Sequence, residues 1–281
     1  MFEIVCKERL NPTVSRMEIK APRVAVKAKA GQFIILRVDS NGERIPLTIA
    51  GTDPEKGTVE IIFQVVGATT ARLERKRVGE TLADFVGPLG RPTELTGLKN
   101  VCVIGGGVGC AIALPIVKAL RTQEAHVTAI AGFRDASLVI LEQEFRSFSD
   151  IFVPMSDDGS WGRKGIVTDA LLERIDDGER FDCVFAIGPL AMMKAVSERT
   201  RSFGIKTICS MNPIMIDGTG MCGGCRVMVD GKMRFACVDG PDFDGHLIDF
   251  DSAMMRNAMY RSWERKKYGE ECNLFKETLH D

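Results

Sequence analysis

Hydrophobic and polar residues follow two different rhythms along the chain, and the rhythm changes near residue 96. Before this point, apolar and polar residues alternate over short stretches such as 32–38 and 58–66, which Gly, Pro and Asp separate. Alternation with a period of two is typical of half-buried strands, and several such strands in a row predict a small antiparallel β-barrel over residues 1–96. The segment 87–92, Gly-Pro-Leu-Gly-Arg-Pro, is expected to end the barrel.

Residues 97–208 show strands that alternate with a helical pattern. Apolar runs at 101–104, 127–132 and 181–188 have the composition of buried strands, and residues 111–121 have helical spacing. Strands alternating with helices predict a parallel α/β sheet, the usual frame of a nucleotide-binding domain.

The last part of the chain changes composition twice. Residues 209–250 are rich in glycine and cysteine, and residues 251–281 are rich in Arg, Lys and Glu with helical spacing in their first half. The fold class predicted from the whole pattern is therefore α+β and multidomain. It combines an antiparallel β-barrel, a parallel α/β domain, a small cysteine module and a C-terminal helical tail.

Composition and charge narrow the possible functions. Apolar residues make up 45% of the chain and charged residues 27%, which is usual for a globular protein with a core. The formal net charge of −1 offers no basic surplus for nucleic acid. The apolar run 101–117 contains four glycines and Pro115, so we expect no membrane span, and the N-terminus lacks a signal-peptide pattern. A cytoplasmic location is expected.

Nine cysteines occur, and they fall into different settings. Three of them, Cys222, Cys225 and Cys237, lie close together among glycines, which in a reducing compartment indicates a metal site more than disulfides. Five others lie in apolar segments and are expected to be buried thiols: Cys6, Cys102, Cys110, Cys183 and Cys209.

A glycine-rich turn between the first strand of the α/β region and its helix suggests a nucleotide site. Gly106, Gly107 and Gly109 lie in this turn, where the backbone can approach a pyrophosphate at the helix N-terminus. The spacing departs from the strict dinucleotide fingerprint, and such turns also occur without ligands. After the next strand, Arg134 and Asp135 are adjacent, so the choice between NAD(H) and NADP(H) stays undecided.

The cysteine module matches a known cluster spacing. Asp217 is followed by four residues and Cys222, then two residues and Cys225, with Cys237 further on, as in the plant-type [2Fe–2S] pattern with aspartate in the first place. Residues 226–235 predict a hairpin with an Asp-Gly turn that returns Cys237 to the side of Cys225. A zinc site with three cysteines and a carboxylate, or buried thiols without metal, are the alternatives.

A barrel, an α/β nucleotide domain and a C-terminal cysteine module, in this order, resemble the ferredoxin–NADP reductase superfamily. The segment Asp-Gly-Thr-Gly-Met-Cys-Gly-Gly-Cys-Arg at 217–226 is the most specific part of the resemblance. Within the superfamily, residues 1–250 are similar to the electron-transfer subunits of dihydroorotate dehydrogenase B. They are more similar to the small (alpha) subunits of NADH-dependent reduced ferredoxin:NADP oxidoreductases, the sulfide dehydrogenase subunits.

The resemblance implies FAD on the barrel, NAD(H) or NADP(H) in the α/β domain and a [2Fe–2S] cluster in the module. Arg44 would pair with the FAD pyrophosphate, and Thr48 would lie near the flavin ring. The residues that match family cofactor segments are Arg44, Pro46, Leu47 and Thr48, then Gly67, Thr69 and Thr70, and finally Gly188 and Pro189 at the nicotinamide. The cluster ligands would be Asp217, Cys222, Cys225 and Cys237.

The implied function is electron transfer, with the cofactors carrying the chemistry and no separate catalytic residue. Asp217 in place of a cysteine and the tail beyond residue 250 favour the ferredoxin:NADP branch, which implies electron bifurcation in a heterodimer with a larger flavin and iron–sulfur subunit. A dihydroorotate dehydrogenase B subunit, a stand-alone NAD(P)H:acceptor reductase and a regulatory module without turnover are the alternatives. An apolar stripe at near-helical spacing in the tail either docks the larger subunit or packs on its own domain. It consists of Met254, Met255, Ala258, Met259 and Trp263.

Overall fold

The computed structural model describes residues 2–277, with side chains up to residue 269. The first domain is a nearly closed antiparallel barrel with strand order β6-β1-β2-β5-β4-β3-β7. Its elements are β1 (Phe2–Asn11), β2 (Val14–Lys20), α1 (Pro22–Ala25), β3 (Phe33–Arg37), β4 (Arg44–Asp53), β5 (Thr58–Gln64), α2 (Ala68–Arg75), β6 (Thr81–Leu82) and β7 (Asp84–Leu89). The predicted barrel is confirmed.

Two details of the barrel differ from the sequence-based expectations. Strand β7 continues through Gly87 to Leu89, because the predicted break is a bulge in its pairing with β3, where Phe33 pairs with Leu89 and Ile35 with Val86. Cys6 is exposed, because only Ile4 of β1 points fully into the core. The other four cysteines of the apolar segments are buried as expected.

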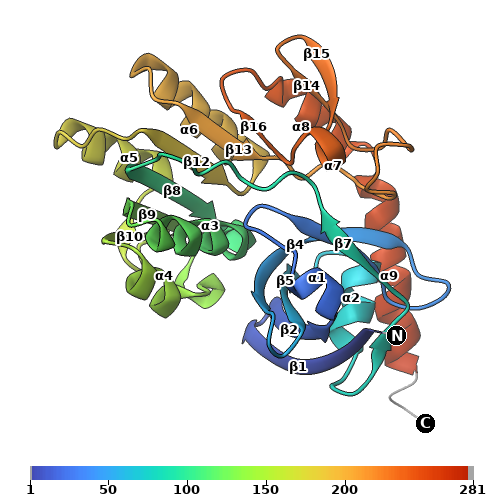
Figure 1. The fold of residues 1–281 in the computed structure, drawn as a ribbon. Coiled ribbons are helices and arrows are strands. Elements are labelled where there is room, and N and C mark those ends of the chain that lie inside the picture. The colour runs from blue at the N-terminus through green and yellow to red at the C-terminus, as the bar shows by residue number, and fades with distance from the viewer. Residues whose placement is uncertain (1, 278–281) are drawn as a thin grey trace.

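The second domain is a parallel α/β sheet with strand order β11-β10-β9-β8-β12-β13-β16, and Figure 1 shows it beside the barrel. Among its strands, only β16 runs antiparallel to its neighbour in the pairings of residues 2–277. The elements are β8 (Asn100–Gly106), η1 (Gly107–Gly109), α3 (Cys110–Thr122), β9 (His126–Phe133), η2 (Ala136–Leu138), α4 (Glu142–Phe148), β10 (Ile151–Ser156), β11 (Arg163–Lys164), α5 (Val167–Asp176), β12 (Cys183–Ile187), α6 (Leu190–Ser202) and β13 (Thr207–Ser210).

The cysteine module lies above the barrel in Figure 1, beside β13 and α6 of the nucleotide domain, and shares a core with both domains. Its elements are β14 (Arg226–Val229), β15 (Lys232–Phe235), α7 (Ala236–Asp239) and β16 (Asp242–Asp244), and α8 (Phe250–Ala258) of the tail follows it. Buried Phe33 and Ile35 of the barrel belong to the same apolar cluster as Cys225 and Cys237. Because β16 extends the α/β sheet, the module is built into the nucleotide domain and does not hang from it as an appendage.

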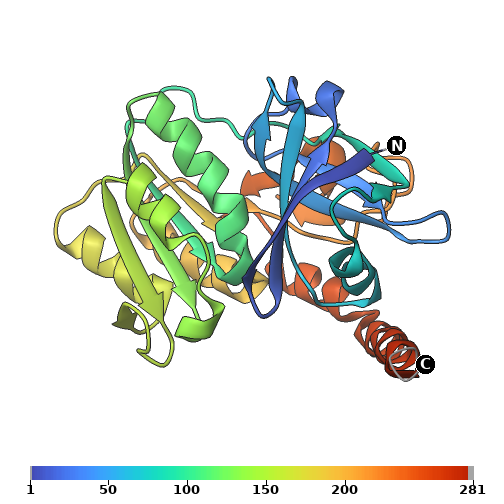
Figure 2. The same cartoon turned by 90° about the horizontal axis from the view of Figure 1, so that it is seen from below.

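The tail forms two helices, α8 and α9 (Arg261–Glu277), so helical structure extends beyond the predicted first half. Helix α8 packs against α6 and β14, and its Ala253 and Met254 rest on the core of the module. Helix α9 runs along the barrel beside α2 and then projects past it, as Figures 1 and 2 show. No helix within residues 2–277 has both the length and the apolarity needed to cross a bilayer.

Candidate functional site

A cavity of about 630 Å³ opens where the carboxyl ends of β8, β9 and β12 face the barrel. Ligands in parallel α/β sheets bind at this edge. Every residue that the sequence analysis assigned to the dinucleotide lines this cavity, and together they are Gly106, Gly107, Gly109, Arg134, Gly188 and Pro189. The structure therefore brings together six residues from three separate turns.

The glycines of the cavity serve two different purposes. A Cβ on Gly109 would lie 2.4 Å from the carbonyl oxygen of Ile187, and one on Gly106 would lie 2.5 Å from the sulfur of Met192. These positions are small because the turn after β8 packs directly on the turn after β12. Gly107 differs, since its φ is +55° and a Cβ there would meet no atom within 4 Å. Its bare backbone faces open space, as a pyrophosphate contact requires.

The two charged residues after β9 have separate roles. Arg134 lines the cavity, whereas the carboxylate of Asp135 accepts a hydrogen bond from the backbone N–H of Ser137 at 2.9 Å and caps η2. Asp157, at the end of β10, also lines the cavity and was not identified from the sequence. The cavity thus presents one cation and one anion near the region where a ribose would lie.

The barrel supplies a wall of the cavity that the sequence analysis did not identify. Asn11 and Gln64 line it from β1 and β5. The side-chain nitrogen of Asn11 donates to the carbonyl oxygen of Leu138 at 2.9 Å, across the domain boundary. Nearby, the guanidinium of Arg16 forms an ion pair with Glu144 of α4 at 2.9 Å. These contacts fix the width of the cavity, and only the folded arrangement of domains reveals them.

Strand β4 carries the first candidate flavin segment along a partly open edge. Residues 44–48 pair with β3, and in the described pairings β5 joins β4 only from Ile49 onward. Alternation along the strand directs Leu47 to the barrel core, where it packs. Arg44, Pro46 and Thr48 share the opposite face and are half-buried. The structure gives Leu47 a packing role and leaves this opposite face available to a ligand.

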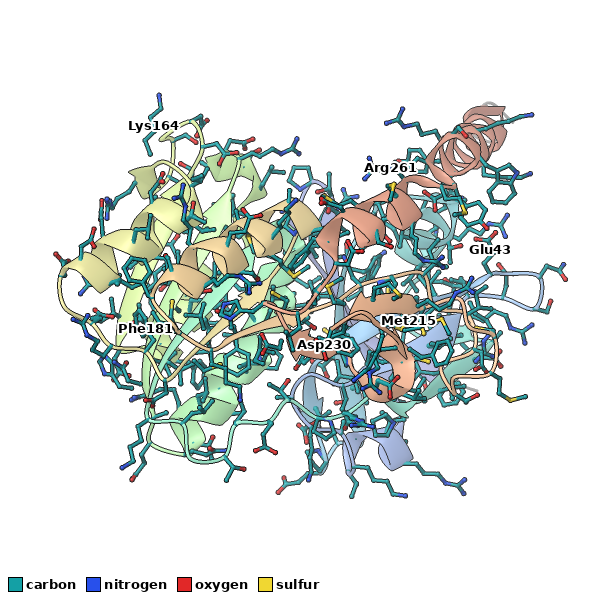
Figure 3. All side chains as sticks on the ribbon, turned by 90° about the horizontal axis from the view of Figure 1, so that it is seen from above. Glu43, Lys164, Phe181, Met215, Asp230 and Arg261 are labelled. Atoms are coloured by element: carbon teal, nitrogen blue, oxygen red, sulfur yellow. The ribbon has the colours of Figure 1, made fainter. Side chains whose placement is uncertain are left out.

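The second candidate flavin segment forms the N-terminus of α2. Gly67 precedes the helix, and a Cβ there would meet no atom within 4 Å. The hydroxyl of Thr70 accepts hydrogen bonds from the backbone N–H groups of Val66 and Gly67. Thr69 donates to Glu43 at 3.2 Å, which ties the helix to the loop before β4. Figure 3 shows Glu43 at the end of the barrel that lies next to the cysteine module.

The cysteine module has the predicted hairpin in the predicted register. Val229 pairs with Lys232 around the turn at Asp230, which Figure 3 labels. The backbone N–H of Cys237 lies 3.5 Å from the sulfur of Cys225, and both thiols are only 1% exposed. The hairpin therefore places Cys225 and Cys237 side by side.

Cys222 and Asp217 come from the loop that precedes the hairpin. The sulfur of Cys222 is exposed and receives the backbone N–H of Gly224 at 3.5 Å. Oδ2 of Asp217 accepts bonds from the N–H and hydroxyl of Thr219 and from the N–H of Met221. The Asp217 carboxylate is close enough to act electrostatically on the thiols of both Cys222 and Cys237.

Hydrogen bonding and burial shift the pKa values of these groups in opposite directions. The N–H of Gly224, helped by the N–H groups of Asp217 and Ile216, lowers the pKa of the Cys222 thiol. Burial, together with Cys225, raises the pKa of the Cys237 thiol to about 12. The bond from Thr219 lowers the pKa of the Asp217 carboxyl. Metal binding displaces the thiol protons, so a cluster would have to deprotonate the buried pair.

The arrangement suits a two-iron cluster better than a single metal ion. Among the described residues, no three His, Cys, Asp or Glu side chains converge on one metal position. Each iron of a [2Fe–2S] cluster is tetrahedral and shares two sulfides, so it needs only two protein ligands. Cys225 and Cys237 form one such pair, and Cys222 and Asp217 of the preceding loop are the candidates for the other. A tetrahedral zinc site would instead need all four around one point.

His246 and Cys209, which lie close to the cluster ligands in sequence, have structural roles. The ring of His246 contacts the hydroxyl of Thr200 on α6 at 3.0 Å, and burial lowers its pKa. The sulfur of Cys209 is buried 3.3 Å from the hydroxyl of Ser197.

Comparison with known proteins matches both the module and the whole chain. Residues 212–249 match the iron–sulfur cluster binding domain of dihydroorotate dehydrogenase B. A homolog of the dihydroorotate dehydrogenase B (NAD(+)) electron-transfer subunit from Thermotoga maritima is 45% identical, covering 95% of this chain and 94% of its own length. The electron-transfer subunit from Shouchella clausii is 34% identical, covering 77% of this chain and 85% of its own.

A solved structure is also similar over nearly the full length. It is that of an NADH-dependent reduced ferredoxin-NADP oxidoreductase, studied for flavin-based electron bifurcation. The two chains are 44% identical with a TM-score of 0.91, and the match covers 96% of this chain and 97% of the other.

Proposed function

Because the chain belongs to the family of dihydroorotate dehydrogenase B electron-transfer subunits, we propose that it moves electrons between NAD(H) and a larger flavin- and iron–sulfur-containing subunit. FAD on the barrel and a [2Fe–2S] cluster in the module supply the conversion between two-electron and one-electron chemistry. The observation that carries the proposal is the placement of Cys225 beside Cys237, at the end of a hairpin that shares a core with the barrel and the nucleotide domain.

The protein's contribution at the nucleotide is to bind and orient it. The backbone of Gly107 and the N-terminus of α3 hold the pyrophosphate, and Gly188 and Pro189 face the nicotinamide. Asn11 and Gln64 close the cavity from the barrel side. NAD(H) is the proposed dinucleotide, supported by Asp157 in the cavity and by the NAD(+) in the names of the relatives.

The flavin would lie against the open face of β4. Thr48 and Pro46 would contact the ring system, with Leu47 supporting the strand from the core. Arg44 and the N-terminus of α2 at Gly67, Thr69 and Thr70 would bind the pyrophosphate. Loss of a charge-assisted phosphate contact costs on the order of 1.5–3 kcal/mol. We therefore expect Arg44→Ala to release FAD about tenfold or more readily in equilibrium dialysis.

The larger subunit would bind next to the cluster, with the tail as a further contact. Helix α8 packs on its own module through Met254, but Met259 is 59% and Trp263 52% exposed. Such residues bury much area and adapt to a partner surface. A role in electron bifurcation is the finer proposal, supported by the full-length similarity to the bifurcating oxidoreductase and by Asp217 at the first ligand position.

We also propose a cytoplasmic location. Eight described cysteines are free thiols, and four of them are buried away from the cluster module. Unpaired thiols in this number are typical of a reducing compartment.

The spectrum of the purified protein tests the proposal directly. We expect absorption from both flavin and [2Fe–2S], with one FAD, two irons and two sulfides per chain on analysis, and bleaching of both features by NADH without oxygen. A colourless or zinc-containing protein would refute the enzyme assignment. Co-expression with the larger subunit then separates the alternatives, because a stand-alone reductase would form no complex.

A further inference from the structure

Arg44 connects the barrel to the loop that carries two candidate cluster ligands. Its Nε donates a hydrogen bond to the carbonyl oxygen of Ile216 at 2.8 Å, although the two residues are 172 positions apart. Its Nη1 lies 3.5 Å from the carboxylate of Asp84 on β7. Asp84 also pairs with Arg37 at 2.8 Å, so its carboxylate is shared between the two guanidinium groups.

The peptide group between Ile216 and Asp217 has Arg44 at its carbonyl end and a candidate cluster ligand, Asp217, at its N–H end. In a trans peptide, the C=O and the N–H point in opposite directions. The carbonyl oxygen of Ile216 accepts from Arg44, so the N–H of Asp217 points away from the guanidinium. Arg44 therefore fixes the orientation of the peptide group that leads into a candidate cluster ligand.

Two physical effects of Arg44 favour negative charge at this end of the cluster. A cation at the carbonyl end polarises the peptide, which strengthens its N–H as a donor. Its charge is also held next to Asp217, because its Nε bonds the carbonyl oxygen of the preceding residue. Hydrogen bonds to sulfur and nearby charge are the means by which a protein sets the potential of an iron–sulfur cluster.

We propose that Arg44 is a positioning residue for the iron–sulfur cluster, which holds the Ile216–Asp217 peptide in place at the first candidate ligand and thereby raises the reduction potential of the cluster. This role rests on the proposed function, because it requires a cluster in the module. It adds to the proposed role of Arg44 toward the flavin, since the hydrogen bond to Ile216 uses Nε, while Nη1 lies 3.5 Å from Asp84. One side chain thus joins the flavin strand to the cluster loop.

The test is an EPR-monitored redox titration of the full-length holoprotein and its variants. We expect Arg44→Gln to lower the midpoint potential of the cluster and to shorten its lifetime in the presence of an iron chelator. Arg44→Lys keeps the charge but loses the fixed Nε donor, so it should shift the potential in the same direction by less. Arg44→Gln can also lose FAD, and the loss of FAD can itself change the cluster potential. The midpoint potential of any flavin-free variant is therefore compared with that of flavin-free wild-type protein.

Arg37→Gln is the matched control. It removes a guanidinium that binds the same Asp84, yet the hydrogen bond that Arg37 donates goes to Ser40 in its own loop at 3.0 Å and not to the cluster loop. Its cluster potential should equal that of the wild type. A wild-type potential in both Arg44 variants, or an equal shift in Arg37→Gln, would overturn the proposal. If Arg44→Gln does not fold, an unchanged potential in Arg44→Lys overturns it alone. Absence of any [2Fe–2S] signal in the wild type would refute the proposed function as well.

Discussion

Among single glycine-to-alanine replacements in the glycine-rich turn, Gly109→Ala should damage the nucleotide site most. Gly109 has an ordinary helical φ of −58°, so alanine meets no backbone strain there. The obstacle is space, because the new Cβ would lie 2.4 Å from the carbonyl oxygen of Ile187 and 2.8 Å from the Cα of Gly188. Both neighbours are backbone atoms at the end of β12, which cannot turn aside as a side chain could.

The size of the effect follows from this distance. Cβ atoms essentially never approach other atoms within 3.0 Å, so the two turns must separate by about half an ångström or more. Overpacking of this kind typically costs about 1–3 kcal/mol. For a protein of this size, that cost corresponds to a fall in Tm of roughly 2–10 °C. Both displaced turns line the cavity, so the KM for NADH should rise about tenfold or more.

Thermal unfolding and NADH oxidation with ferricyanide as acceptor measure the two effects, with FAD and iron content determined in parallel. Gly178→Ala is the control, since Gly178 has φ +97°, lies outside the cavity lining, and has no atom within 4 Å of the point that an added Cβ would occupy. It should cost about 1 kcal/mol through backbone strain and leave the KM unchanged. If Gly109→Ala matched Gly178→Ala in both Tm and KM, the packing argument would be wrong.

Three further predictions concern other parts of the molecule. Asp217→Ala should make the cluster labile and Asp217→Cys should retain it at a lower potential, as iron analysis and EPR would show; an unchanged spectrum in Asp217→Ala would exclude Asp217 as a ligand. Burial raises the pKa of the Asp242 carboxyl because it disfavours the charged form. The free energy of unfolding therefore falls as the pH rises above the pKa of an unfolded aspartate. Asp242→Asn should raise the Tm at pH 8, and this gain should vanish near pH 4; an equal gain at both pH values would contradict the assignment. Trp263→Ala should weaken the binding of the larger subunit by roughly 1–3 kcal/mol, measured as an affinity, without loss of cofactors. An affinity equal to that of the wild type would show that Trp263 of α9 is not a contact.

The sequence predicted those features that depend on neighbours along the chain. The register of the hairpin followed from the Asp-Gly turn, because a two-residue turn fixes which residues pair, and Val229 does pair with Lys232. The alternation of buried strands and helices was likewise enough to predict the parallel sheet and the position of the turn at Gly107. The candidate dinucleotide residues come together because the turns after parallel strands meet at one edge of the sheet.

Features that depend on how domains pack were not predictable in this way. The contact between Arg44 and Ile216 joins residues 172 positions apart, and no periodicity relates them. The barrel wall of the cavity at Asn11 has the same origin. Cys6 was expected to be buried from its apolar neighbours, but only one residue of β1, Ile4, is fully buried. Local hydrophobicity cannot show which face of a strand the rest of the fold covers.

The position of the module bears on how electrons pass through the protein. Strand β16 pairs with β13 of the nucleotide sheet, and the hydroxyl of Thr93, between barrel and sheet, donates to Asp242 of β16 at 2.5 Å. A Cβ on Gly218, next to Asp217, would lie 2.7 Å from Leu89 of the barrel, so the cluster loop also rests on β7. The three candidate cofactor sites are therefore fixed to one another through packed backbone and a shared core, not through a flexible linker. Because close packing resists displacement, the distances between the sites are set when the chain folds and do not depend on a docking step within the subunit.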